Sequence, residues 1–114
     1  MQLQWFLVER LQGLERLSSV GMNSLPNLTN GHSNAAVGYS ALYLSTTGSE
    51  NTAIGHGAGH LITTGSNNTC VGKSANVSGT VNNSSAIGNG ASVTASNTIQ
   101  LGNTSVTSIG GYAN

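Results

Sequence analysis

The chain of 114 residues has no aspartate, a single cysteine and a single proline, and only 5% of its residues are charged. So few charges, with a formal net charge of zero, cannot neutralise many phosphates, which argues against nucleic-acid binding. One cysteine cannot form a disulfide within the chain. Without aspartate no Ser-His-Asp triad can form. We therefore expect no enzyme activity, no cofactor and no metal.

Long apolar runs are also missing. No stretch approaches the ~20 apolar residues that a membrane span requires. The apolar run near the N-terminus ends at Glu9 and is not preceded by a basic residue, unlike the start of a signal peptide. We therefore expect a protein that neither spans a membrane nor carries an export signal of its own.

Gly, Ser, Thr and Asn make up more than half of the chain, a composition that can indicate disorder. A five-residue motif of the form Asn-Thr-Ala-Ile-Gly argues against disorder, because it recurs at 34–38, 51–55, 68–72 and, more loosely, 84–88. Gly38, Gly55 and Gly72 lie 17 residues apart. A fixed period of this length predicts an all-β fold, a short parallel β-roll or β-solenoid over residues 34–111.

Each repeat divides into two short strands and two turns. In the second repeat we expect strands at 51–54 and 58–63, with turns at 55–57 and 64–67. Aliphatic residues before the glycines are predicted to stack as an internal core ladder, one rung (~4.8 Å) apart. They are Val37, Ile54, Val71, Ile87 and Leu101.

Small residues also recur in register. An alanine lies three residues beyond four motif glycines and is predicted to fill the core or a trimer interface. These residues are Ala41, Ala58, Ala75 and Ala91. Cys70 stands where other copies of the motif have alanine, so we expect a small buried residue rather than a reactive thiol.

Residues 1–20 are predicted to form an amphipathic α-helix, because Leu3, Leu7, Leu11, Leu14 and Leu17 share one helical face. So short a helix needs something to pack on. It either caps its own solenoid or pairs with copies of itself, or it docks onto a larger partner. The docking residues would be Trp5, Phe6, Leu7, Leu11 and Leu14. Residues 21–33 are interpreted as a linker and 112–114 as a tail.

A core of roughly one Val or Ile and one Ala per repeat hardly offsets the chain entropy of ordering the repeats. Association of several copies, each burying a second apolar face, would remove this deficit. The composition therefore predicts an oligomer.

The motif Asn-Thr-Ala-Ile-Gly-x-x-Ala, with Thr-Thr-Gly-Ser-Asn between copies, resembles the head repeats of trimeric autotransporter adhesins. The same repeats occur in bacteriophage tail-fibre and related virion proteins, and the stretch 97–111 is similar to the end of such heads. The resemblance covers residues 34–111 and implies a homotrimer of parallel β-rolls. Fold alone does not imply function.

Two functions follow from the resemblance. The first is a structural virion protein of a phage, made in the host cytoplasm: a trimeric capsid decoration (cement) protein, or a short spike or fibre protein. Its N-terminal arm would attach to the major capsid or tail protein. The alternative is an adhesin or tail-fibre head that binds a cell-surface receptor or host glycan, for which Tyr39 and Tyr43 are the available aromatic side chains.

Two smaller patterns have competing explanations. His56 and His60 are either surface or stacking histidines, or ligands of an ion at a three-fold axis; no aspartate and no nearby second cysteine completes a ligand set. Thr46-Thr47 and Thr63-Thr64 lie 17 residues apart, as in ice-binding ladders, but they fit a turn better.

Overall fold

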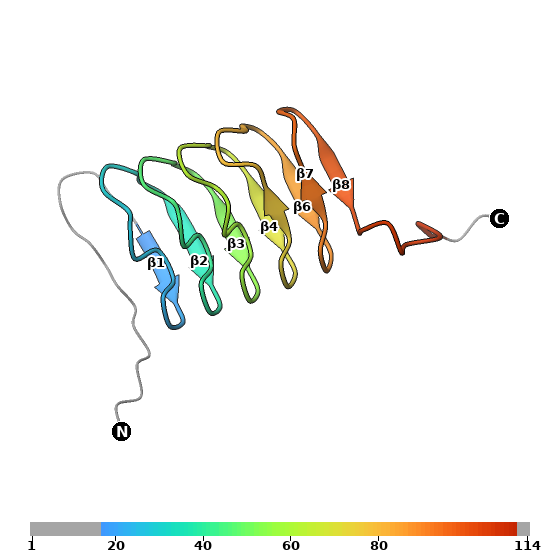
Figure 1. Ribbon diagram of the computed structural model, residues 1–114, viewed down its shortest axis with the longest axis horizontal. Coiled ribbons are helices and arrows are strands. Elements are labelled where there is room, and N and C mark those ends of the chain that lie inside the picture. Colours follow the sequence, from blue (N-terminus) through green and yellow to red (C-terminus); the bar gives the residue numbers. More distant parts are fainter. Residues whose placement is uncertain (1–16, 112–114) are drawn as a thin grey trace, which may run out of the picture.

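The structure is a computed structural model that describes residues 17–111, and these residues form a parallel β-solenoid (Figure 1). Its strands are β1 (Leu17–Val20), β2 (Asn34–Val37), β3 (Thr52–Ile54), β4 (Thr69–Val71), β5 (Asn76–Val77), β6 (Ser85–Ile87), β7 (Ser92–Val93) and β8 (Ile99–Leu101). A six-stranded parallel sheet has the order β1-β2-β3-β4-β6-β8, and β5 pairs with β7 in a second sheet. The all-β solenoid predicted from the period is thus confirmed.

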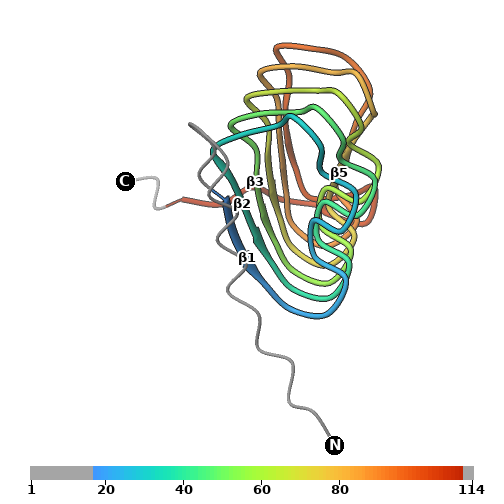
Figure 2. The same ribbon diagram turned by 90° about the vertical axis from the view of Figure 1, so that its left-hand side faces the viewer.

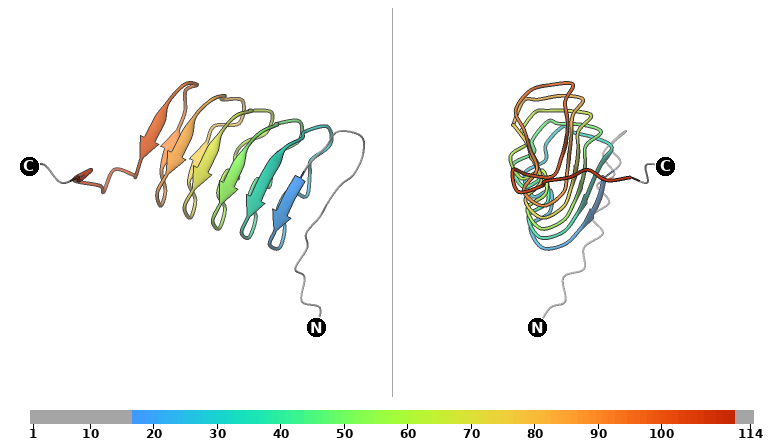
Figure 3. Two further views of the ribbon diagram at one scale, coloured as in Figure 1. Left: turned by 180° about the vertical axis from the view of Figure 1, so that it is seen from behind. Right: turned by 90° about the vertical axis from the view of Figure 1, so that its right-hand side faces the viewer.

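Successive rungs stack one behind another, each slightly displaced from the last (Figure 2). The pairing places Ala35 opposite Thr52 and Thr52 opposite Thr69, so motif positions coincide from rung to rung. Seen from behind, the strands of the large sheet run side by side along the whole body (Figure 3). The sequence period is therefore one circuit of the solenoid.

Glycine after each motif strand is required by the stacking itself. Gly55 has a φ of 129°, which L side chains rarely adopt. A Cβ added to Gly55 would lie 2.8 Å from the carbonyl carbon of Gly72 in the next rung. The turn can stack only if no side chain stands at this position.

The first rung begins earlier than predicted. The helix predicted over residues 1–20 does not include residues 17–20, which form β1 and pair in parallel with β2. Residues 21–33 are not a linker: they form the turns of this first rung, in which Leu28 is buried. Inter-rung hydrogen bonds to β2 outweigh the local leucine spacing there. The rest of the predicted helix, and the tail 112–114, lie outside the described residues.

The predicted second strand at 58–63 is also wrong. The chain there forms consecutive turns, closed by hydrogen bonds such as Ile62 N–H to Gly59 O (3.0 Å). A second strand appears only in later rungs, as β5 and β7. The positive φ of Gly59 explains the difference, because its counterpart Asn76 in β5 is not among the residues with positive φ, and a left-handed residue at this position curls the backbone.

The predicted internal ladder lies on the outside. Val37, Ile54, Ile87 and Leu101 are 37–45% exposed, whereas Ala36, Ala53, Cys70 and Ala86 are fully buried. Side chains alternate across a strand, so motif alanine inside requires the following aliphatic residue outside. The large buried side chains come instead from the turns and the second sheet. They are Leu42, Ile62, Val77 and Val93.

A buried column of asparagines joins the rungs. Asn51 Nδ2 donates to Gly65 O (2.8 Å), and Asn51 Oδ1 accepts from Asn68 N–H (3.0 Å). Asn34 and Asn68 make the corresponding bonds in their own rungs. Each amide therefore satisfies one backbone group in its own turn and one in the next rung. The asparagine column thus fills its part of the interior without large apolar side chains.

Candidate interaction surfaces

An apolar column runs along the outer face of the large sheet. It contains Val20, Val37, Ile54, Val71, Ile87 and Leu101, one from each strand of the sheet. Val71 is partly buried, and Ile54 and Leu101 are each 45% exposed. A continuous exposed apolar stripe of this kind marks an interaction site.

The two other predicted sets lie elsewhere. Ala41, Ala58, Ala75 and Ala91 are fully buried within the solenoid, so within one chain they fill its core. Trp5, Phe6, Leu7, Leu11 and Leu14 lie outside the described residues, and their docking role stays a prediction. Sequence reasoning could have placed the outer column correctly, since the motif alternates one small and one large residue.

Cys70 is buried in the alanine column of β4. Desolvation raises the pKa of its thiol from 9.0 to about 11, although hydrogen bonds with the backbone of Gly59 and Val77 act in the opposite direction. A thiol that stays protonated and has no access to solvent is a poor nucleophile. The position is structural.

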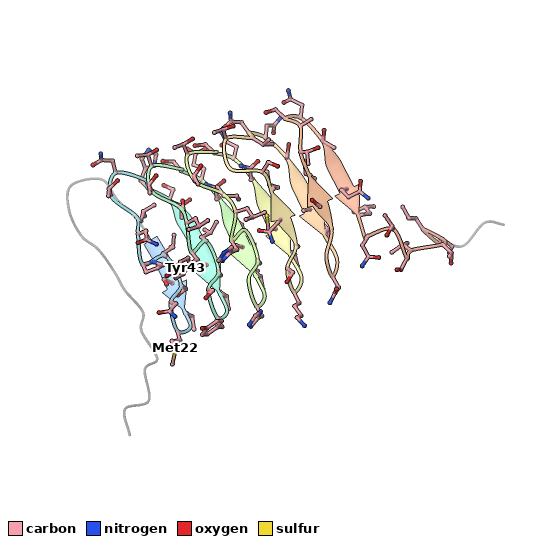
Figure 4. All side chains as sticks on the ribbon, in the orientation of Figure 1. Met22 and Tyr43 are labelled. Atoms are coloured by element: carbon pink, nitrogen blue, oxygen red, sulfur yellow. The ribbon has the colours of Figure 1, made fainter. Side chains whose placement is uncertain are left out.

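Two tyrosines stack on histidines of the next rung. The ring centroids of Tyr39 and His56 lie 5.2 Å apart with an interplanar angle of 16°, and those of Tyr43 and His60 lie 5.4 Å apart at 13°. Both distances are those of favourable aromatic pairs. Figure 4 shows Tyr43 on its rung, and Met22 at the tip of the turn after β1. Backbone register places Met22, Tyr39 and His56 in one column along these tips.

A shallow groove borders both aromatic pairs. It is lined by Tyr39, His56, His60, Leu61, Ser74 and Asn76, among others, and has a volume of about 340 Å³. Asn76 forms its floor: its Oδ1 accepts from Leu61 N–H (3.1 Å), and its Nδ2 donates to Ser74 O (3.2 Å). This groove joins residues from three successive rungs, which the sequence period alone did not indicate.

Charge plays a small part in the described segment, where Glu50 and Lys73 are the only acidic and basic residues. Residues 17–111 contain no cluster of three or more His, Cys, Asp or Glu side chains that could hold a metal ion. In the same range no helix is long and apolar enough to cross a membrane.

Comparison with protein-family models, with curated proteins and with solved structures finds no match to this chain. The likeness to adhesin heads and phage fibres therefore stays a resemblance of repeat motifs.

Proposed function

We propose that the protein is a structural homotrimer whose chains pack through the outer apolar column, and that it serves as an accessory protein of a phage virion. The observation that carries the proposal is the column itself, which repeats once per rung along the solenoid. A second copy in parallel orientation presents the same column with the same spacing. Symmetric association therefore matches apolar residue to apolar residue over the full length.

The positions of the charged residues also support packing through the outer apolar column. Neither Glu50 nor Lys73 belongs to a strand of the large sheet, so no like charges face each other when identical sheets meet. The second column on this face consists of small or β-branched residues, such as Ala35, Thr52 and Thr69, which let two sheets approach closely. A trimer rather than a dimer follows from the resemblance to adhesin-type repeats.

Replacing Ile54 with aspartate tests the interface. A charge in the middle of the column loses solvation when copies associate, so we expect the trimer to dissociate. Leu44→Asp is the matched control, since Leu44 is 37% exposed but lies in a turn. Sedimentation equilibrium should give a trimeric mass for the wild type and Leu44→Asp, and a monomeric mass for Ile54→Asp. A monomeric wild type, or a trimeric Ile54→Asp, would contradict the proposal.

The virion role is supported by the motif resemblance and by a surface with few charges, suited to a compact knob rather than to catalysis. The form we favour is a capsid decoration protein or a short spike, held by its N-terminal arm to a capsid or tail protein. Co-purification of the chain with virions at a fixed ratio to the major capsid protein is the expected result. Its absence from washed virions would exclude the role.

A second candidate function is a head that binds a cell-surface receptor or glycan. The stacked tyrosines and histidines favour it, because they gather exposed aromatic surface and a groove on one side of the solenoid.

A further inference from the structure

The two aromatic stacks end in the middle of the solenoid. Residues 61–111 contain no aromatic side chain and no histidine, so no ring follows His56 or His60 in the later rungs. At the tips, the residue after His56 in register is Lys73. Each stack therefore presents a last ring, His56 or His60, with no aromatic neighbour beyond it.

The second stack ends because the next rung places no ring in register with His60. Gly59 N–H bonds to Ala75 O, and Asn76 N–H bonds to Ala91 O, so Gly59 and Asn76 occupy matching positions. The residue after Asn76 is Val77, in the place that His60 has one rung earlier. Val77 is fully buried in β5, so its side chain does not cover the imidazole of His60. The groove lies where the turns of residues 58–61 meet the start of β5.

Four polar side chains that line the groove make no hydrogen bond within residues 17–111. The hydroxyl of Tyr39, the ring nitrogens of His56 and His60 and the hydroxyl of Ser74 make no side-chain hydrogen bond there, and Leu61 adds apolar surface with 48% exposure. The backbone is already used, because Gly57 N–H bonds to Tyr39 O and Ser74 N–H to His56 O. An extended peptide would therefore find no free strand edge here.

We propose that this groove binds a saccharide unit, with an apolar sugar face against His60 and Leu61 and sugar hydroxyls at Tyr39, His56 and Ser74. Ring surface next to uncharged donors and acceptors matches a ligand that combines a C–H face with a rim of hydroxyls. Phosphate-rich ligands fit poorly, since Lys73 is the only lysine or arginine among residues 17–111. Lys73 does not line the groove but follows His56 in the tip column, so a carboxylate on a bound sugar would lie near its ammonium group.

The inference rests on the second candidate function, for which it names the site, and it does not require the trimer. Sedimentation reports on the apolar column, whereas binding at the groove is read at the histidines, so the two can fail separately.

NMR of the imidazole protons of the full-length protein gives a direct test, because the chain has three histidines and His32 lies on a different turn. The probes are maltohexaose, tri-N-acetylchitotriose, lactose and sialyllactose. At least one should shift the His56 and His60 signals saturably, with a Kd on the order of 1 mM or below, and leave His32 unchanged. Tighter binding of sialyllactose than lactose would identify the carboxylate contact with Lys73; equal binding would identify a neutral sugar.

Substitutions test whether the NMR shifts arise from binding in the groove. His60→Ala should weaken binding about tenfold or more, the loss of roughly one stacking contact. Asn89→Ala, in the tip column two rungs beyond His56 and outside the groove, should bind like the wild type. His56→Ala is a second loss variant if His60→Ala does not keep the wild-type backbone spectrum. No saturable shift with any probe, equal shifts at His32, or unchanged affinity in the folded loss variants would overturn the proposal.

Discussion

Single residues carry much of the stability here because the interior is narrow. Asn51 is fully buried, and its side chain serves two backbone groups, Gly65 O and Asn68 N–H. In a wider core, leucine side chains would stabilise the fold through buried contact area. In this one, buried amides hold neighbouring rungs together by hydrogen bonds that must be complete.

Asn51→Ala should lower the free energy of unfolding by roughly 2–5 kcal/mol, since two buried groups lose their partners. Asn82→Ala is the control: Asn82 Oδ1 accepts from Ser66 N–H (2.8 Å), but Asn82 is exposed, so water can replace the bond. Its expected cost is below about 1 kcal/mol. Urea unfolding of both variants gives the comparison, and equal losses would show that the column is not a stabilising element.

Cys70 makes stability depend on alkaline pH. Its folded pKa of about 11 exceeds the ordinary value of 9.0, so the unfolded chain releases the proton first. This contribution is complete below pH 9.0 and is lost as pH rises towards 11, an effect of roughly 2–3 kcal/mol. Cys70→Ala, which copies the alanine of other rungs, should lose less stability than wild type between about pH 8 and about pH 11. Urea unfolding of wild type and Cys70→Ala at both pH values measures the two changes in stability. Equal losses of stability in the two proteins would contradict the prediction.

At the scale of elements, the turns and the second sheet, rather than the motif strands, hold the large buried apolar side chains. The motif strands point Ala36, Ala53 and Ala86 inward, while the 58–63 segment sends Ile62 into the core and Leu61 out. The sequence predicts the opposite for the motif strands, because aliphatic residues recur at one motif position and are expected to stack inside. The observed orientation, with the motif alanines facing inward, leaves room for the turns to fold back over the sheet.

The adjacent residues Leu61 and Ile62 test which apolar side chains of the turns stabilise the fold. Ile62→Ala should cost about 2–5 kcal/mol, since it empties a fully buried site. Leu61→Ala removes a similar side chain that is 48% exposed and should cost less than about 1 kcal/mol. Thermal unfolding of the two variants measures the difference. A larger loss for Leu61→Ala would mean that its exposed face is covered in the native assembly.

At the scale of the whole molecule, the solenoid is a rigid stack with one apolar face and one aromatic side, and the arm before it is the expected attachment. Trp5→Ala with Phe6→Ala should abolish attachment to virions and leave the trimer folded, because aromatic anchors dominate interface energy. Co-sedimentation with virions measures attachment, and analytical ultracentrifugation checks the trimer. Normal decoration by the double variant would remove the docking role of residues 1–20.

The sequence by itself determined the period, the parallel stacking of equivalent positions and the thin core, because residues 17 apart must meet when rungs of equal length stack. The earliest rung was within reach too, since Gly21 lies 17 residues before Gly38. Only the tertiary structure decided which side of each strand faces inward, that 58–63 curls into turns, and that Tyr39 and His60 border one groove. Because side chains alternate along a strand, either set could face inward. Which set does so depends on the space left by turns that are distant in sequence.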